Sequence, residues 1–264
     1  MKIGFIGMGN MAKAMIGGML AKGVAAGEDI IGSAKTEVTR QEMACRYGIE
    51  TVADNGKVAG DADILVLAVK PQLFGEVILQ IRDEVREDTV VVSIAAGKTM
   101  EEIESLFGRS LKLVRCMPNT PALVGEGCSG VCRNERVTQE EMAECMELIG
   151  SFGMAREVPE RLINAVAGVS GCSPAYVFLF IEALADGAVA AGMMRKDAYT
   201  FAAQAVMGSA KLMLDTGKHP GELKDMVCSP AGTTIEGVRL LEERGFRGAV
   251  MDAVKASVEK AESM

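Results

Sequence analysis

The sequence predicts two domains of different class, an α/β domain built on a doubly wound parallel sheet and an all-α domain that follows it. Two observations lead to this prediction. Up to residue 158, apolar runs of strand length alternate with segments whose apolar residues recur with the period of a helix. From Pro159 onward no strand-like run appears, and helix-period segments follow one another. We therefore expect an α/β domain over residues 1–158 and a helical domain over residues 159–264.

The chain opens with an apolar run, Ile3–Ile6, a glycine turn and a helix-period segment. In a Rossmann-type sheet the first glycine of such a turn takes its backbone angles, and the second lets a pyrophosphate approach the main chain at the helix N-terminus. A small third residue, here Ala12, lets the helix pack closely on the strand. An ordinary glycine-rich turn has the same composition, but its place between an N-terminal strand and a long helix favours a dinucleotide site. The expected contacts are Ile6, Gly7, Met8, Gly9, Asn10 and Met11.

The residues after the second predicted strand, over 29–32, decide which dinucleotide is expected. NAD-binding units carry Asp or Glu there, which accepts a hydrogen bond from the ribose 2′-hydroxyl. This chain has Ser33 and Lys35 instead. A hydroxyl and an ammonium suit a 2′-phosphate, whereas a carboxylate would repel it. The sequence therefore favours NADP(H) over NAD(H), and the alternative is a solvated turn that does not contact the cofactor.

The rest of the first domain continues the alternation of strands and helices. Strands are expected over 49–52, 62–69, 90–95, 112–116, 127–133 and 154–158, and helices over 36–47 and 138–150, with Asp54-Asn55 capping a brief one. Three of these strands end in distinctive sequences, AVKP, SIAAG and RCMPNTP. Because ligands bind at the carboxyl ends of parallel strands, we expect these ends to line one crevice together with the glycine turn. The alternative is that each is only a tight connection.

The second half contains six helix-period segments, over 161–169, 174–192, 196–216, 220–228, 233–245 and 246–262. The segment over 174–191 is apolar nearly all round, with the sequence PAYVFLFIEALADGAVAA. A helix with so little polar surface has to be buried on several sides. We therefore expect it at the centre of a bundle or at an interface between subunits, and we expect the protein to be a homo-oligomer.

Residues that could carry chemistry outside the glycine turn are few. Ser229-Pro230 breaks one helix, and Gly232-Thr233-Thr234 starts the next, where main-chain N–H groups and hydroxyls suit a carboxylate. On residue chemistry alone, simple capping of the helix by Ser or Thr explains this stretch equally well. The sequence has no nucleophile elbow or hydrolase-like carboxylate pair, and its single histidine, His219, has no evident partner. So few candidate catalytic side chains are typical of enzymes whose cofactor carries out the reaction.

Composition argues against several classes of partner. The net charge is −8 and lysines and arginines do not cluster, which disfavours binding to nucleic acid or to an anionic membrane. No apolar run reaches the roughly 18 residues that a membrane helix needs, and the chain enters a strand directly rather than a signal peptide. The seven cysteines are scattered without a C-x-x-C pair, so we expect no metal site. Together these features predict a cytoplasmic protein with free thiols.

Five stretches spread over the whole chain carry a family resemblance: FIGMGNMAKAM, LAVKPQ, RCMPNTPA, SGCSPAYVFLFIEALADGAV and HPGELKDMVCSPAGTTIEGV. With them the chain resembles the pyrroline-5-carboxylate reductases, and the last stretch is far more specific than the glycine turn. The resemblance implies reduction of 1-pyrroline-5-carboxylate, a cyclic imine carboxylate, to L-proline with NADP(H) or NAD(H), the last step of proline biosynthesis. It also implies a homodimer with intertwined helical domains, which in several members assembles into a decamer of five dimers.

The resemblance further implies roles for individual residues. Ser33 and Asn55 would contact the adenosine ribose of the cofactor. The part of the dinucleotide towards its nicotinamide would be lined by Ala68, Val69, Lys70, Pro71, Ala95, Ala96 and Gly97. The substrate carboxylate and ring nitrogen would be held by Ser229, Thr233 and Thr234, with Glu160 at the edge of the pocket.

Departures from the family pattern are small. Cys172-Ser173 replaces a commoner Ser-Gly, and Cys228 replaces a commoner Thr or Ser. Ala231 stands where glycine is commoner. Its Cβ disfavours the positive φ that a glycine would allow, which concerns the shape of the turn after Pro230.

Two other classes share parts of these features. The β-hydroxyacid dehydrogenases have the same architecture, but their catalytic motif places a lysine one turn into the helix after a glycine turn. Here the residues after Gly171 read CSPAYVFLFIEAL, without a lysine. A non-catalytic nucleotide-binding regulator would need no carboxylate-binding loop, whereas the GTTI sequence is intact. A reductase of another imine remains the third alternative.

Overall fold

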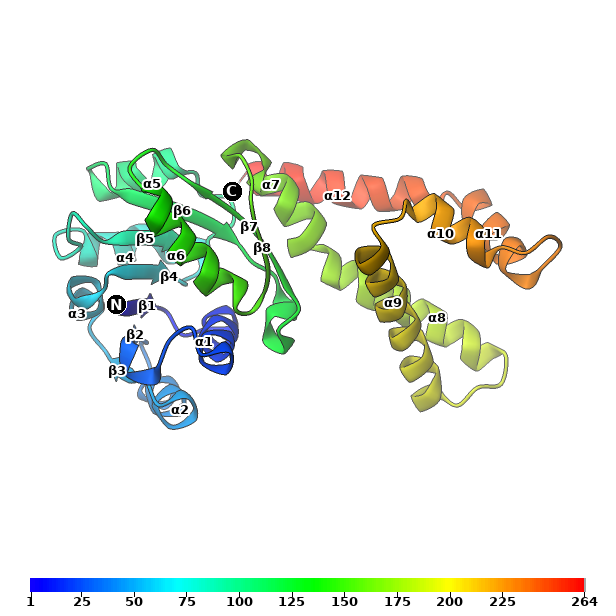
Figure 1. The fold of residues 1–264 in the computed structure, drawn as a ribbon, viewed down its shortest axis with the longest axis horizontal. Helices are drawn as coiled ribbons and strands as arrows, with labels where there is room; N and C mark the ends of the chain where they lie inside the picture. The colour runs from blue at the N-terminus through cyan, green and yellow to red at the C-terminus, as the bar shows by residue number, and fades with distance from the viewer. Residues whose placement is uncertain (264) are drawn as a thin grey trace. The chain divides into compact units, whose positions relative to one another are not determined.

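The computed structural model describes residues 1–263, which form two compact units. The first unit comprises Met1–Cys172 and the C-terminal residues from Ser257 onward, and the second comprises Ser173–Ala256 (Figure 1). The division that the sequence predicts after residue 158 lies upstream of this one. The difference arises because the turns after Pro159 pack on the sheet, where Ile163 is buried in the apolar core. The domain bounds 1–158 and 159–264 stay a prediction.

The first unit is built on an eight-stranded sheet with the order β3-β2-β1-β4-β5-β6-β7-β8. Its strands are β1 (Ile3–Ile6), β2 (Ile30–Ser33), β3 (Glu50–Val52), β4 (Ile64–Leu67), β5 (Val90–Ser93), β6 (Lys112–Met117), β7 (Gly127–Arg133) and β8 (Gly153–Glu157). Neighbouring strands run parallel except β6 and β7, which are antiparallel. From β1 the chain winds outward to β2 and β3 on one side and from β4 to β6 on the other. This is the doubly wound order that the sequence predicts, so the fold class is confirmed.

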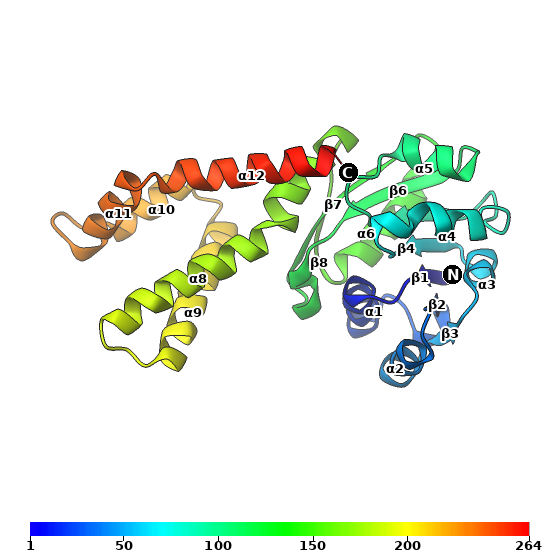
Figure 2. The ribbon, with the colours of Figure 1, turned by 180° about the vertical axis from the view of Figure 1, so that it is seen from behind.

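Helices cover both faces of this sheet. Successive residues of a strand point to opposite faces, so strands that are apolar throughout leave an apolar surface to be covered on each face. Ile3 and Phe5 of β1 belong to one apolar core, and Ile6 of the same strand belongs to the other. The first core also contains side chains of α1 (Asn10–Lys22), α2 (Glu37–Tyr47) and α6 (Gln139–Gly150), and the second those of α3 (Asn55–Asp61), α4 (Phe74–Ile81) and α5 (Met100–Phe107). In Figure 1 α6 lies in front of the sheet, and from behind, in Figure 2, α4 does.

Side-chain caps begin several helices close to the predicted residues. The Thr36 hydroxyl accepts a hydrogen bond from the Thr39 N–H at 3.3 Å ahead of α2. The Asp54 carboxylate accepts one from the Gly56 N–H at 2.8 Å ahead of α3. Thr138 forms a capping box at the start of α6. Each cap satisfies a main-chain N–H that the helix itself leaves without a partner.

Two predicted elements are wrong in detail. The second strand includes Ser33 and begins at Ile30, because Asp29 belongs to a 3₁₀ turn, η1 (Gly27–Asp29). Residues 161–169 do not form one regular helix. The chain passes instead through a 3₁₀ turn, a single α turn and a π turn, which are η4 (Glu160–Leu162), α7 (Ile163–Val166) and η5 (Ala167–Gly171). Two further 3₁₀ turns follow β4 and β6, η2 (Pro71–Leu73) and η3 (Thr120–Val124).

The second unit consists of helices joined by short turns, as the sequence predicts. They are α8 (Ser173–Ala190), α9 (Arg195–Thr216), α10 (Pro220–Val227), α11 (Thr233–Glu243) and α12 (Phe246–Glu262), the last of which extends beyond the unit. The rings of Phe180 and Phe246 pack with their centroids 6.0 Å apart. The Tyr176 hydroxyl donates a hydrogen bond to the Ala253 carbonyl at 3.4 Å. These two contacts join α8 to α12.

The apolar helix α8 leaves large side chains uncovered, with Phe178 66% and Leu179 67% exposed. Together with the turns before it, α8 forms a helical stretch, Glu160–Ala190, that is long and apolar enough to cross a membrane by length and composition alone. The expectation that no apolar segment reaches that length is therefore wrong, because the turns from Glu160 run into α8 without a break. The same length and composition fit a helix that a second subunit covers.

Candidate active site

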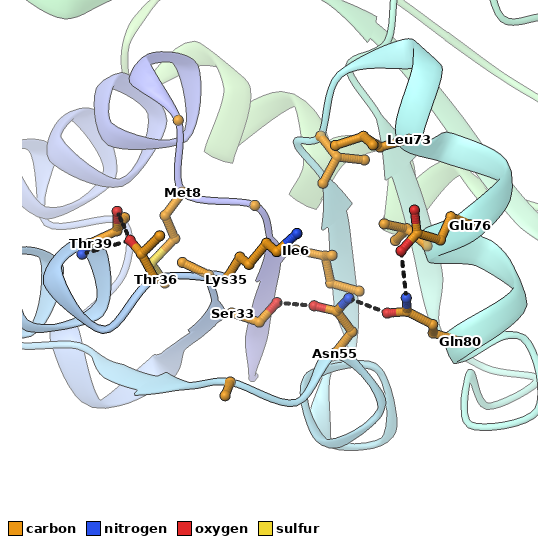
Figure 3. A pocket seen from close by; sticks show the side chains of 16 residues that line it. Ile6, Met8, Ser33, Lys35, Thr36, Thr39, Asn55, Leu73, Glu76 and Gln80 are labelled. Carbon is orange, nitrogen blue, oxygen red and sulfur yellow. Dashed lines mark hydrogen bonds between the residues drawn. The ribbon is translucent and has the colours of Figure 1, made fainter.

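A cavity of about 510 Å³ lies at the carboxyl ends of β1, β2 and β4 (Figure 3). Eight of the predicted cofactor residues border it, namely Ile6, Gly7, Met8, Gly9, Ser33, Lys35, Asn55 and Val69. The sequence analysis missed a second group on or beside α4, which consists of Leu73, Glu76, Val77 and Gln80. Their spacing of three, four and seven residues marks one face of a helix, and this spacing next to a strand end was the available signal.

Gly7 shows why the turn after β1 needs a glycine. Its φ is +91°, and a Cβ there would lie 2.7 Å from the Ala68 carbonyl oxygen and 2.8 Å from a methyl group of Val69. The turn is fixed on both sides. Gly7 N–H donates to the Ser33 carbonyl at 3.0 Å, and Ala68 N–H donates to the Ile6 carbonyl at 2.8 Å. The turn is thus wedged between the ends of β2 and β4, where a side chain has neither room nor suitable backbone angles.

The surroundings of Gly9 leave room for the phosphates of a dinucleotide. Gly9 is the N-cap residue of α1 and makes no side-chain cap. A Cβ at Gly9 would meet no atom within 4 Å, so the space in front of the helix is open. The first N–H groups of α1 and the positive end of its dipole therefore face a space that a pyrophosphate can enter. Asn10 and Met11 form the first turn of this helix.

Ser33 is placed differently from the sequence expectation. It is the last residue of β2, and although its atoms border the cavity, its side chain has no surface exposed to water. Its hydroxyl donates to the Asn55 side-chain oxygen at 2.6 Å, and the Asn55 amide donates to the Gln80 side-chain oxygen at 2.7 Å (Figure 3). Ser33 therefore holds Asn55 in place, and its hydroxyl hydrogen is already used.

Lys35 is the cation at this end of the cavity. It follows β2, is exposed, and its side chain extends across the cavity in Figure 3. The hydroxyls of Thr36 and Thr39 lie on the same side and are 2.8 Å apart. The three residues directly after β2, Ala34, Lys35 and Thr36, carry no carboxylate, and the acidic residue that borders the cavity, Glu76, comes from α4. This arrangement suits a phosphate next to Lys35 better than a bare ribose hydroxyl.

The remaining predicted cofactor residues lie outside this cavity, at neighbouring strand ends. Ala68, Lys70 and Pro71 follow β4, and Ala95 and Gly97 follow β5. Because β4, β5 and β6 are adjacent and parallel, their three distinctive end sequences meet at one edge of the sheet, as predicted. This part of the edge lies on the other side of β1 from Lys35.

Glu160, which the resemblance places at a pocket edge, makes two strong contacts within the first unit. One of its carboxylate oxygens accepts a hydrogen bond from the Arg115 guanidinium at 2.6 Å and another from the Met100 N–H at 2.8 Å. Arg115 lies in β6 and is only 4% exposed. Sequence reasoning missed Arg115, although a charged residue inside the apolar strand KLVRCM was a visible signal.

The turn before α11 determines how Ser229, Thr233 and Thr234 are presented. Gly232 N–H donates to the Ser229 carbonyl at 3.0 Å, and Ala231 has a φ of +56°. Ala231 is the one non-glycine residue with positive φ in the described part of the chain. It adopts the strained conformation that its Cβ disfavours. A Cβ at Gly232 would lie 2.3 Å from the Ser229 hydroxyl oxygen, so this glycine also leaves room for that hydroxyl.

The capping interpretation of this stretch is wrong. The N-cap residue of α11 is Gly232, which supplies no side chain, and no side-chain cap is present. Thr233 and Thr234 are the first two helical residues, Thr233 exposed and Thr234 half-buried. The first N–H groups of α11 consequently have no side-chain acceptor at the N-cap, and the two threonine hydroxyls lie beside them.

All seven cysteines are free thiols. Burial raises the pKa of Cys116 and of Cys145 to about 12 and that of Cys132 to about 11. These three thiols are therefore protonated near neutral pH and behave as small apolar side chains of the core. Among residues 1–263 no group of three or more His, Cys, Asp or Glu side chains could hold a metal ion.

Comparison with protein families gives two matches. A family described as pyrroline-5-carboxylate reductase dimerisation matches residues 160–264. A family described as NADP oxidoreductase, coenzyme F420-dependent, matches residues 2–97, which include the glycine turn and the ends of β4 and β5.

Similar proteins cover the whole chain. It is 49% identical to a pyrroline-5-carboxylate reductase of Escherichia coli (strain K12), over 100% of this chain and 98% of the relative. It is 44% identical to one from Methanosarcina acetivorans, over 100% and 97%. Among solved structures, a pyrroline-5-carboxylate reductase from Coxiella burnetii aligns with a TM-score of 0.93 and 33% identity, over 99% of this chain and 97% of that one. A Plasmodium falciparum pyrroline carboxylate reductase with NADP bound aligns with a TM-score of 0.89 and 32% identity, with the same coverage.

Proposed function

The chain belongs to the pyrroline-5-carboxylate reductase family, and from this premise we propose that its first unit holds NADP(H) and its second unit holds the substrate. The protein is an NAD(P)-dependent oxidoreductase acting on a CH–NH group, and it reduces 1-pyrroline-5-carboxylate to L-proline in proline biosynthesis. The observation that carries the assignment of the cofactor to the first unit is the turn at Gly7 and Gly9. It opens an α-helix N-terminus onto a cavity that also contains Lys35.

The cofactor residues divide into three groups along the sheet edge. In our proposal, residues 7–11 hold the pyrophosphate with main-chain N–H groups of α1. Lys35, with Thr36 and Thr39 beside it, holds the 2′-phosphate, and Asn55 holds the adenosine ribose in the position that Ser33 fixes. The nicotinamide half then lies along the ends of β4 and β5, lined by Ala68, Val69, Lys70, Pro71, Ala95 and Gly97.

The substrate residues act at the start of α11. The reduced nicotinamide supplies the hydride that the imine carbon accepts. Main-chain N–H groups at Thr233 hold the substrate carboxylate, with the Ser229 hydroxyl beside them. The Thr234 hydroxyl hydrogen-bonds the ring nitrogen, whose positive charge disappears during the reduction. Thr234 thereby orients the imine and needs no shifted pKa, since the protonated imine requires no strong acid.

The protein works, in our proposal, as a cytoplasmic homodimer whose helical units form the interface. Exposed apolar side chains on α8 and α9, including Phe178, Leu179 and Phe201, support this assignment. The dimerisation family that matches residues 160–264 supports it too. Free thiols at all seven cysteines are in keeping with a reducing compartment. Five such dimers would form the decamer that the family resemblance implies.

A direct assay tests the proposed function. Purified protein is mixed with NADPH and 1-pyrroline-5-carboxylate, and the loss of NADPH absorbance is followed together with the formation of proline. We expect proline in stoichiometric amount to the NADPH consumed. A 3-hydroxy acid with NADP⁺ serves as the control for β-hydroxyacid dehydrogenase activity, and other cyclic imines test for a different imine substrate. Absence of turnover with 1-pyrroline-5-carboxylate under conditions in which NADPH binds would refute the proposal.

A further inference from the structure

Arg115 is unusual because it is the one charged residue, among those the structure describes, whose surface is almost entirely buried. Its guanidinium donates to the Glu160 carboxylate at 2.6 Å, while the Glu160 side chain is 37% exposed. A buried ion pair is weak as a source of stability, since desolvation of the charges offsets much of their attraction. The pair therefore calls for an explanation other than stability alone.

The same Glu160 oxygen also accepts the Met100 N–H at 2.8 Å. Met100 is the first residue of α5, where a helix leaves its N–H groups without internal partners. The start of α5 already has a complete capping box between Thr99 and Glu102. That box uses the N–H groups of Thr99 and Glu102 and leaves the Met100 N–H to Glu160, whose carboxylate thereby connects α5 to β6 through Arg115.

The loop held by this hydrogen bond is short. Lys98 and Thr99 alone separate Gly97, whose φ is +71°, from Met100. At the other end of the loop, Ile94 N–H donates to the Leu67 carbonyl at 3.4 Å, which fixes the loop against β4. With both ends held, the path of residues 95–97 depends on where α5 begins.

These residues lie where the nicotinamide half of the cofactor is proposed to bind. The adenosine cavity is at the ends of β1 and β2, and the pyrophosphate turn is at Gly7 and Gly9. A dinucleotide extending from that turn away from β2 reaches the ends of β4 and β5, because the strand order places them on the opposite side of β1. Residues 95–97 follow β5 at this place.

We propose that Glu160 is a positioning residue: with Arg115 it holds the start of α5, and thereby holds residues 95–97 against the nicotinamide half of NADP(H). This inference rests on the proposed function for the location of the cofactor. It gives Glu160 a role through α5 in place of contact with the substrate. Because this role concerns one half of the cofactor, binding measurements can distinguish it from a general contribution to folding, which would affect both halves.

The experiment compares two ligands on the full-length Glu160→Gln variant. Glutamine is nearly isosteric but loses the charge that holds Arg115. NADPH probes the whole cofactor site, whereas 2′,5′-ADP probes only its adenosine half. We expect the Kd of 2′,5′-ADP to stay within about two-fold of wild type and the Kd of NADPH to rise about five-fold or more, because a charge-assisted hydrogen bond is among the strong ones. The fluorescence of bound NADPH should shift towards that of the free cofactor, and kcat should fall.

Glu157→Gln is the matched control. Glu157 lies three positions before Glu160, and its carboxylate pairs with Arg133 of β7 at 3.7 Å. It should leave both dissociation constants and the fluorescence unchanged. If Glu160→Gln does not fold, Glu160→Asp, which keeps the charge but shortens its reach, is measured in the same way with the same expected split between the ligands.

Two results would overturn the inference. An equal rise in the Kd of both ligands would show a general structural role. An unchanged Kd and an unchanged fluorescence of bound NADPH would show that the contacts of Glu160 do not affect the nicotinamide half of the site. Both measurements are made without the imine substrate. A wild-type protein that binds both ligands but does not reduce 1-pyrroline-5-carboxylate would therefore count against the proposed function. In that case the binding data would still decide the role of Glu160.

Discussion

Asn119 and Ser170 are joined across 51 residues of chain, because the Asn119 side-chain amide donates to the Ser170 carbonyl at 3.0 Å. The Asn119 side-chain oxygen accepts the Cys128 N–H at 2.8 Å. Asn119 is buried and follows β6, and Ser170 lies in the π turn η5. The amide thus satisfies two main-chain groups of different segments and fixes the path of the PNTP loop.

We predict that Asn119→Ala destabilises the protein by about 2–4 kcal/mol. The variant leaves the Ser170 carbonyl and the Cys128 N–H without their partner, and each unsatisfied buried group costs about 1–3 kcal/mol. Chemical denaturation of the purified variant measures the loss. Gln72→Ala, at an exposed position, is the control and should change stability by less than about 0.5 kcal/mol. A stability within that margin for Asn119→Ala would show that the two groups find other partners.

Ala231→Gly should stabilise the protein. Ala231 has a φ of +56°, a left-handed conformation that costs an L-residue about 1–2 kcal/mol. Glycine removes this cost but loses about 0.5–1 kcal/mol through the greater freedom of the unfolded chain. We expect a net gain of about 0.5–1 kcal/mol, measured as a rise in Tm. The same substitution at Ala203, inside α9, should lower Tm. A lower Tm for both variants would contradict the strain at Ala231.

Lys35→Glu should change the preference for the cofactor. A carboxylate at this position repels a 2′-phosphate, so we expect kcat/KM for NADPH to fall about ten-fold or more while that for NADH changes little. Ser33→Asp is a poorer test, because Ser33 is buried and its hydroxyl donates to the Asn55 side-chain oxygen. Lys22→Glu, on the last turn of α1, controls for the change in overall charge. Equal losses with both cofactors would show that Lys35 does not contact the 2′-phosphate.

Thr234→Val should separate catalysis from folding. Valine keeps the shape of threonine but cannot hydrogen-bond the ring nitrogen of the substrate. We expect kcat/KM for 1-pyrroline-5-carboxylate to fall about ten-fold or more, equivalent to about 1.4 kcal/mol of transition-state stabilisation. Tm should hardly change, since Thr234 does not cap α11, whose N-cap is Gly232.

Thr200→Val provides the comparison for this measurement. The Thr200 hydroxyl donates to the Lys196 carbonyl within α9 at 3.1 Å, so its loss is structural only. Activity of Thr200→Val should equal that of wild type. Wild-type kcat/KM in Thr234→Val would place the contact with the ring nitrogen elsewhere.

The apolar surface of α8 predicts an oligomer. Light scattering should give a mass at least twice the 27.9 kDa of one chain at micromolar concentration, and ten times that mass if five dimers assemble. Phe178→Glu places a charge in the exposed apolar surface and should lower the mass or cause aggregation, because a buried unpaired charge is costly at an interface. Val38→Glu, at an apolar residue on α2 that is more exposed than Phe178, should leave the mass unchanged. A stable species of one chain in the wild type would refute the prediction.

The sequence by itself determined the features that depend on residues close together in the chain. Alternation of apolar runs predicted the doubly wound sheet, and the caps at Thr36, Asp54 and Thr138 marked helix starts to within a residue. The glycine turn is equally local, because the positive φ of Gly7 and the open helix end at Gly9 follow from one short motif.

Only the tertiary structure decided how side chains far apart in the chain share their hydrogen bonds. The sequence suggested a free hydroxyl at Ser33, yet this hydroxyl donates a hydrogen bond to the side-chain oxygen of Asn55, 22 residues away. The spacing of Leu73, Glu76, Val77 and Gln80 marks one face of a helix, but only the packing of α4 beside the end of β1 places that face on the cofactor cavity. The contacts of Glu160 with Arg115 and with the N–H of Met100, 45 and 60 residues away, were not visible in the sequence. A hydrogen bond forms only where both groups are brought within about 3 Å. That distance is set by the packing of the whole sheet and not by the local sequence.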